Sequence, residues 1–371
     1  MSSLHALTEA ILDGRDEGAW AVLADHLQSI GDVRGELWAL EAALARSAGP
    51  ARLPLVHRRN DVLADGAASW MLPLLEELDR EPGPKGAHAS ELAALRARRQ
   101  SWSELRHLPQ LFLQQRPDIQ LAWRAGFIVA ARVRGSVDRL RRLLSSTLSC
   151  PAAILLGCLD IDVVADGFPE PESMARLIQG LGDTALETPA RGPGSELGTA
   201  RHLRVRAHTA RPWKPDWVTG WAPNLRRLSL FQAEFSGFRH PRVERLQVAG
   251  ERADRLLGSL GHADLPALHS LAVGPFDAIA DDGGPLGALL EGAALPALTT
   301  LRLARLQPEI EQPLLDALLH TPLFLRLRHL ELEWLRDRPG TRAWLHENRS
   351  SLGHLTIRDI REHGELFCGE L

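Results

Sequence analysis

A short apolar pattern recurs through the later part of the sequence and limits the folds that the chain can adopt. In each copy, an apolar residue is followed by two more, three and five positions later. The clear copies are Leu225-Leu228-Leu230, Val243-Leu246-Val248, Leu268-Leu271-Val273, Leu298-Leu301-Leu303, Leu327-Leu330-Leu332 and Leu352-Leu355-Ile357. Leu156-Leu159-Ile161 and Leu203-Val205 are weaker copies. Successive clear copies begin roughly 18 to 30 residues apart, which indicates a stacked repeat architecture.

This pattern predicts one short strand in each copy, because a strand sends alternate side chains to opposite faces of its sheet. The apolar residues then enter a shared core, and no copy can bury its apolar side without its neighbours. The asparagine usual in leucine-rich repeats, three residues after the last apolar position, is missing. Residues 254–261, 284–293 and 311–321 have spacing suited to return helices. We therefore expect an α/β fold over residues 119–371, an irregular leucine-rich-repeat solenoid with a curved parallel sheet.

The segment before residue 119 has helical spacing. Residues 4–14, 19–30, 34–46 and 56–78 each place apolar residues on one helical face. Gly31 suits the position after one helix, and Asp32 can cap the next. Residues 80–90 form a Pro/Gly linker in this interpretation, and residues 91–105 return to helical spacing. We expect residues 1–118 to form an all-α N-terminal region, with a hairpin at about residues 4–46.

The helical hairpin also carries a resemblance. The stretch ADHLQSIGDVRGEL (24–37) resembles the ADxL and GDxRGEL phrases of the bacterial repeat-companion domain, although His26 and Ile30 depart from the usual residues. ADGAASWMLPL (64–74) and WRAGFIVAARV (123–133) are similar to further phrases of these proteins, the second to the strand that opens the repeats. The resemblance implies an intracellular interaction protein with degenerate leucine-rich repeats, and it transfers no catalytic residue.

Composition argues against several classes of protein. The chain has 371 residues, 44% of them hydrophobic, and a formal net charge of −4, whereas a dedicated nucleic-acid binder usually has a basic excess. Its three cysteines, Cys150, Cys158 and Cys368, fit neither a disulfide framework nor a zinc knuckle. The N-terminus has no signal pattern. We expect a cytoplasmic protein with no cofactor, no metal and no membrane-spanning segment.

One cluster within the hairpin invites a catalytic interpretation. Asp25 and His26 lie just before Asp32, Arg34 and Glu36. Neighbours in a helix point about 100° apart, so Asp25 cannot orient His26 directly. The sequence has no nucleophile elbow, phosphate-binding loop or HExxH motif. We expect a structural hairpin and no enzyme. The alternative is an enzyme with a site at the interface of the helical and repeat regions.

Two other segments offer binding surfaces. The basic run Arg132–Arg142 suits either a solvated face or a nucleic-acid or phosphate contact. Trp213, Trp217 and Trp221 are spaced four apart, and they either pack into the core or form an exposed anchor for a partner. Both alternatives stay open at the level of the sequence.

The residues between the strand leucines form the main candidate site. In a parallel sheet they would line one concave face of mixed polarity with a few aromatic anchors, which suits a protein partner. We expect a non-enzymatic adaptor or scaffold that binds a protein of unknown identity through this face. The residues expected to contact the partner are Arg204, Arg206, Arg226, Arg227, Phe231, Arg302, Glu331, Glu333, Trp334 and Arg358.

Overall fold

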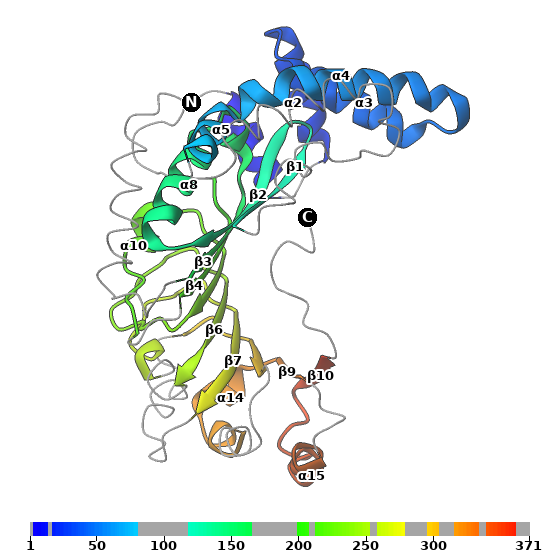
Figure 1. Cartoon of the computed structure of the whole chain (residues 1–371). Helices are drawn as coiled ribbons and strands as arrows, with labels where there is room; N and C mark the ends of the chain where they lie inside the picture. Colours follow the sequence, from blue (N-terminus) through cyan, green and yellow to red (C-terminus); the bar gives the residue numbers. More distant parts are fainter. Residues whose placement is uncertain are drawn as a thin grey trace. The chain divides into compact units, whose positions relative to one another are not determined.

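A computed structural model describes residues 3–13, 17–80, 118–164, 199–207, 212–252, 258–278, 295–303, 315–333 and 339–360. The fold is mixed α/β: helices make up the described N-terminal part, and ten strands form one open sheet in the order β1 to β10 (Figure 1). The chain divides into two compact units. The first holds the described residues up to Asp162 together with residues 199–201, and the second holds residues 163–164 and the described residues from His202 onward.

The first unit is mostly helical in its described part. Its helices are α1 (Ser3–Leu12), α2 (Glu17–Ser29), α3 (Val33–Arg46), α4 (Arg52–Trp70), α5 (Leu72–Asp79) and α8 (Val137–Ser149), with 3-10 turns η1 (Gly49–Ala51) and η3 (Pro151–Leu155). Its strands are β1 (Ile119–Arg124), β2 (Phe127–Gly135) and β3 (Cys158–Val163), the last of which ends at the unit boundary.

The second unit alternates strands with short helices. Its strands are β4 (His202–Ala207), β5 (Arg227–Phe231), β6 (Arg245–Arg252), β7 (Ser270–Ala278), β8 (Thr300–Leu303), β9 (His329–Glu333) and β10 (Thr356–Ile360). Its helices are α10 (Trp217–Trp221), α14 (Pro322–Arg326) and α15 (Pro339–Glu347). Residues 258–260 and 315–319 are also helical, whereas the expected return helix at 284–293 lies outside the described residues.

The predicted helical hairpin is confirmed, and so are its end signals. Gly31 adopts a φ of 76° after α2, a left-handed conformation that costs glycine little. Asp32 then caps α3, because its side chain accepts a hydrogen bond from the backbone N–H of Arg34. A difference follows at residues 56–78, where the expected single helical stretch is two helices, α4 and α5, separated at Met71. Pro73 explains the break, because proline is tolerated in the first turn of a helix but not inside one.

The first two strands correct another expectation. Residues 123–133 do not form one strand that opens a repeat array, because β1 and β2 pair antiparallel as a hairpin. Ala125 and Gly126 make its two-residue turn with φ values of 50° and 80°. Two successive positive φ values are the signature of a type I′ turn, whose twist matches that of the flanking strands. The sheet is therefore antiparallel at this end and parallel from β4 to β10.

The parallel strands of the second unit are in register at their leucines. One row across the sheet consists of Leu203, Leu228, Leu246, Leu271, Leu301, Leu330 and Ile357, and a second row consists of Val205, Leu230, Val248, Val273, Leu303 and Leu332, with Asp359 of β10 paired to Leu332. All members of the two rows on β4 to β9 are buried. Strands stacked in this way pool apolar surface that no single strand could cover. The expectation that these residues form a shared core is confirmed for the described strands.

A regular backbone ladder joins the segments that precede these strands. The carbonyl of Arg226 accepts the N–H groups of both Glu244 and Arg245, and the carbonyl of Glu244 accepts those of His269 and Ser270. The same pair of hydrogen bonds recurs further along the sheet. The carbonyl of His269 accepts the N–H groups of residues 299 and 300, and the carbonyl of Thr299 accepts those of residues 328 and 329. The ladder satisfies backbone groups at the sheet edge and fixes the register of each strand against the one before it.

The last predicted copy is in a different register from the one its sequence suggests. The pattern Leu352-Leu355-Ile357 aligns Leu355 with Leu330, but the structure pairs Ile357 with Leu330 and places Leu355 before the strand. The backbone N–H of Thr356 donates to the carbonyl of Arg328, which continues the ladder and sets this register. The shift of two residues keeps the same residues on each face, because side chains alternate with a period of two.

Candidate functional site

The face of the second unit's sheet opposite the leucine rows carries three further rows of side chains, which we call the polar face. The first row is His202, Arg227, Arg245, Ser270, Thr300, His329 and Thr356. The middle row is Arg204, Ser229, Gln247, Ala272, Arg302, Glu331 and Arg358. A third row, Arg206, Phe231 and Ala249, crosses β4 to β6. Strand alternation places all three rows on one surface.

Charge is distributed unevenly over this face. From β4 to β8, every charged residue in the three rows is basic: Arg204, Arg206, Arg227, Arg245 and Arg302. On β9 and β10 the charges compensate each other, because Nη1 of Arg358 lies 3.7 Å from Oε1 of Glu331. The polar face therefore has a basic section over its first strands and a self-paired section at the opposite end.

Between Arg204 and Arg302, the middle row carries uncharged side chains on β5, β6 and β7. Ser229 and Ala272 are buried within the row, and the hydroxyl of Ser229 donates to Oε1 of Gln247 at 3.2 Å. The rows on either side carry longer side chains on the same strands, among them Arg227, Arg245 and Phe231. On β5 and β6, Ser229 and Gln247 of the middle row therefore lie between Arg227 and Arg245 on one side and Phe231 and Ala249 on the other.

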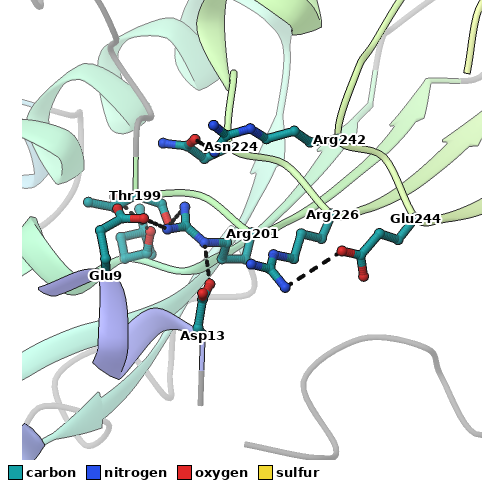
Figure 2. Close-up of polar contacts among 9 residues, drawn as sticks. Glu9, Asp13, Thr199, Arg201, Asn224, Arg226, Arg242 and Glu244 are labelled. Atoms are coloured by element: carbon teal, nitrogen blue, oxygen red, sulfur yellow. Dashed lines mark hydrogen bonds and ion pairs between the residues drawn. The ribbon is translucent and has the colours of Figure 1, made fainter. Parts of the chain in front are cut away.

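Most of the predicted contact residues lie on the polar face. Seven of them belong to its rows: Arg204, Arg206, Arg227, Phe231, Arg302, Glu331 and Arg358. Arg226 does not, because it precedes β5, and its Nη1 lies 3.6 Å from Oε1 of Glu244 (Figure 2). Glu333 ends β9, and Trp334 lies outside the described residues.

Two members of the first row were not among the residues expected to contact the partner. His202 and Arg245 occupy the same row as Arg227. Each lies directly before the first buried residue of its strand, Leu203 or Leu246. The sequence did contain the signal. If each strand begins one residue earlier than its apolar spacing suggests, the residue directly before the first leucine lies on the same face as Arg227.

The cluster with a possible catalytic role is built into the packing of the first unit. Nη2 of Arg34 lies 2.5 Å from Oδ2 of Asp32, and its Nη1 donates to the carbonyl oxygen of Pro151 at 2.9 Å. The same guanidinium lies over the ring of Phe127, 4.5 Å from its centroid, a favourable cation–π position. Burial raises the pKa of Asp32, but hydrogen bonds and charge from Arg34 outweigh it and lower that pKa overall. Arg34 thus links α3 to β2 and η3.

The other members of that cluster point to separate partners. Asp25 is exposed on α2, while Glu36 on α3 accepts Nε of Arg58 on α4 at 2.5 Å. Gly35 lies where α3 crosses α2, and a Cβ added to it would be 2.5 Å from the carbonyl oxygen of Ala24. Glu41 contributes to the same framework, because its carboxylate accepts the backbone N–H of Ala125 in the β1–β2 turn, although burial raises the pKa of this group. These contacts assign the cluster to structure.

Arg201 makes a comparable structural contact at the end of the first unit. Its side chain is 5% exposed and pairs with Glu9 at 2.5 Å and with Asp13 at 3.2 Å (Figure 2). Its Nη1 also donates to the carbonyl oxygen of Thr199. A buried guanidinium needs such partners, because an uncompensated buried charge is costly. Glu9 on α1 and Asp13 just after it thereby tie the N-terminal helix to the segment that precedes β4.

The basic run at residues 132–142 is compensated by acidic neighbours. Arg132 pairs with Asp160 at 2.8 Å, Arg134 with Asp162 at 3.5 Å and Arg142 with Glu77 at 2.8 Å. Arg139 pairs with Asp118. These contacts favour the interpretation as a structural, partly solvated face, because a phosphate-binding surface gains its affinity from positive charge that is available to the ligand.

Of the two alternatives for the three tryptophans, the structure supports packing into the core. Trp213 and Trp221 are buried, and Trp217 stacks on Trp213 with ring centroids 6.1 Å apart. Trp217 also meets Trp221 edge to face at 5.4 Å. Nε1 of Trp213 donates to the carbonyl oxygen of Phe231 at 3.0 Å. The cluster supports the strand that carries Phe231 and offers no exposed anchor of its own.

A buried histidine completes the polar inventory of the second unit. His240 is fully buried; its Nδ1 accepts the backbone N–H of Arg242, so Nε2 carries the proton of the neutral ring and donates to the carbonyl oxygen of Ala222 at 3.1 Å. Burial lowers the pKa of His240.

Among the residues that the structure describes, no group of three or more His, Cys, Asp or Glu side chains is arranged to hold a metal ion. The described helices also include none with the length and apolar character needed to cross a bilayer.

Comparisons with known proteins leave the family of this chain open. No protein-family model matches the sequence, and no curated protein matches it either. A crystal structure of a Bacteroides fragilis protein, solved as a structural-genomics target, is similar over 57% of this chain and 59% of its own length, with 15% identity and a TM-score of 0.40. The match thus spans less than two thirds of that protein.

Proposed function

We propose that this protein is a non-enzymatic adaptor or scaffold that binds a protein partner through the polar face. We further propose that the second unit is an irregular leucine-rich-repeat solenoid and that the N-terminal hairpin is of the repeat-companion type. In-register parallel strands, buried leucine rows and the recurring backbone ladder support the repeat interpretation. The cytoplasmic location expected from the sequence stays a prediction.

The observation that carries the proposal is the composition of the polar face. Its rows combine six arginines and an aromatic residue, Phe231, with small and hydroxyl side chains across neighbouring strands. Protein interfaces are enriched in arginine and aromatic residues, and their affinity is concentrated in a few anchors within a polar surround. A rigid sheet positions such anchors at little entropic cost on binding.

The site favours this function over the alternatives. The carboxylates of the hairpin have separate surroundings: Asp32 and Glu36 pair with Arg34 and Arg58, and Asp25 is exposed. Four of the five arginines of residues 132–142 are paired with acidic residues, as described above. We therefore propose neither a hydrolytic site in the hairpin nor nucleic-acid binding through the basic run.

A comparison of charge-reversal variants tests the proposal. The full chain would be used to capture partners from cell extract, and any partner identified by mass spectrometry would be purified and its affinity measured directly. Arg227→Glu/Arg245→Glu changes two residues of the first row, and Arg141→Glu/Arg239→Glu is a matched control at exposed positions away from the polar face. We expect the first pair to lower the affinity at least tenfold and the control to leave it unchanged. Equal affinity for both variants would remove the polar face as the binding site.

A further inference from the structure

We propose that the polar face binds a phosphorylated side chain of the partner at a site on β6 to β8. The site consists of six residues in two neighbouring rows, which we call the donor block: Arg245, Ser270 and Thr300 in the first row, and Gln247, Ala272 and Arg302 in the middle row. This inference rests on the proposed function and adds the chemistry of the group that the partner presents. Five of the six side chains can donate hydrogen bonds, and none of the six is a carboxylate.

Arg302 has a donor that the described residues do not satisfy. Its Nε is buried, and no described residue accepts a hydrogen bond from it. Glu331 is the partner of Arg302 in the register of β8 and β9, but its carboxylate pairs with Arg358, where Oε1 lies 3.7 Å from Nη1. A buried donor without an acceptor is costly, so a ligand that supplies an acceptor beside Arg302 removes that cost.

Arg245 is similarly without a carboxylate partner among the described residues. The residue directly before it, Glu244, is engaged with Arg226, and the atoms Oε1 and Nη1 of this pair are 3.6 Å apart (Figure 2). Arg245 and Arg302 give the donor block a charge of about +2. A phosphomonoester carries about −1.5 to −2 at pH 7 and matches this charge, whereas one carboxylate would compensate only half of it.

Ala272 gives the donor block a low centre. It is 4% exposed, and its side chain is a single methyl group, so a ligand can approach the sheet closely above it. Gln247 and Arg302 are its direct neighbours on β6 and β8. Arg245 and Thr300 are its diagonal neighbours, about 8 Å away, a distance that long side chains can bridge. A phosphate group above Ala272 is therefore within reach of both guanidinium groups.

Neutral donors complete the set around this centre. The hydroxyl of Ser229 donates to Oε1 of Gln247 at 3.2 Å, so the amide NH₂ of Gln247 is the group that can donate to a ligand. The hydroxyls of Ser270 and Thr300 can also donate. A phosphate group offers three acceptor oxygens, and guanidinium groups bind it in bidentate geometry. The donor block thus supplies the charge and the number of donors that a phosphorylated side chain requires.

The test uses defined phosphopeptides with the full chain. The probe is a fluorescein-labelled peptide of neutral residues with one central phosphoserine, and its matched peptides carry serine or glutamate at that position. We expect the phosphoserine peptide to bind about tenfold or more tightly than either matched peptide, because charge-assisted hydrogen bonds are the stronger ones. Arg245→Gln/Arg302→Gln should lower its affinity by about tenfold or more, and Arg141→Gln/Arg239→Gln, at exposed positions away from the polar face, should leave it unchanged.

Two additions make this test independent of folding defects and of free anions. Circular dichroism verifies that each variant is folded, and Arg302→Lys, which keeps the charge but loses the fork of donors, should bind the phosphoserine peptide more weakly than the unmodified protein. Inorganic phosphate is the competitor, and we expect it to displace the peptide only at a concentration well above that of unlabelled phosphopeptide. Displacement at equal concentrations would mean that the site takes free phosphate, and it would overturn the inference.

The remaining outcomes separate this inference from the proposed function. Equal affinity for the phosphoserine and glutamate peptides, or affinity that is unchanged by Arg245→Gln/Arg302→Gln, would overturn the inference. So would a single-stranded oligonucleotide that binds the donor block more tightly than the phosphopeptide, or a captured partner that binds equally well after phosphatase treatment. If that partner is nevertheless lost with Arg227→Glu/Arg245→Glu, the proposed function stands without the phosphate group.

Discussion

Replacing Gly35 by alanine tests the packing of the helical hairpin more sharply than any other single change. An alanine Cβ at this position would lie 2.5 Å from the carbonyl oxygen of Ala24 and 2.7 Å from the backbone nitrogen of Gln28. Both atoms belong to the backbone of α2, so neither can rotate away. Ordinary contact begins at 3.4 Å, and α2 and α3 would have to separate by roughly 0.9 Å.

Two effects of opposite sign decide the outcome. Glycine inside a helix is about 1 kcal/mol less favourable than alanine, so propensity alone predicts that Gly35→Ala stabilises the protein. Overpacking costs about 1 to 3 kcal/mol, and here the upper end applies because backbone meets backbone. The hydrogen bond from Nε2 of Gln28 to the carbonyl oxygen of Gly35, 3.0 Å long, would also be strained. We expect a net loss of about 2 kcal/mol in the free energy of unfolding.

Urea unfolding of the full chain, followed by far-ultraviolet circular dichroism, measures this difference through the transition midpoint. Gly220→Ala is the matched control, because Gly220 also lies in a helix, α10, and an added Cβ there meets nothing within 4 Å. We expect Gly220→Ala to be neutral or up to about 1 kcal/mol stabilising. If Gly35→Ala proves as stable as the unmodified protein, the close approach of α2 and α3 is not a feature of the folded chain.

Three further substitutions test other parts of the structure. Asp32→Ala removes a helix cap and leaves the guanidinium of Arg34, 11% exposed, without its carboxylate; we expect a loss of about 2 to 4 kcal/mol in urea unfolding, and a loss near zero would contradict the pairing. His240→Gln removes a ring whose pKa is lowered below 6.5 by burial. Because the folded state then binds fewer protons than the unfolded state, the contribution of His240 to stability is fully present above pH about 6.5 and decreases as the pH falls below that value. The melting temperature of the variant should therefore depend less on pH in the acid range. Leu246→Ala, at a core position 2% exposed, should cost about 2 to 5 kcal/mol. Gln247→Ala on the other face loses the hydrogen bond from Ser229 and should cost only about 1 kcal/mol; equal effects would mean that the alternation is misassigned.

Local signals in the sequence predicted much of the hairpin and the strands. Gly31 and Asp32 act through backbone conformation and a hydrogen bond to a residue two positions away, and both depend on the nearest neighbours in the chain. The leucines of each copy likewise specify a strand with one apolar face through their spacing alone. The side of the sheet on which Arg227 lies follows from the same alternation.

Longer-range details were not predictable in the same way. The two-residue offset of the last copy accompanies a backbone hydrogen bond between Thr356 and Arg328. The observed register pairs Asp359 with Leu332, whereas apolar spacing alone favours Ile357 in that position. The antiparallel hairpin at residues 119–135 depends on two positive φ values at Ala125 and Gly126. Alanine is uncommon in that conformation, so the turn has no strong signal in the sequence.

The candidate site shows the same division. The sequence by itself determined which residues alternate with the leucines, and hence which side chains share the polar face, because strand periodicity is a local property. Only the tertiary structure decided which of these residues are neighbours: it places Arg227 beside Arg245 and Glu331 beside Arg358. It also assigned the charges of the hairpin and of residues 132–142 to structural pairs. Such pairings depend on the register between strands and on contacts between residues far apart in the chain, and the spacing of residues along one segment does not contain that information.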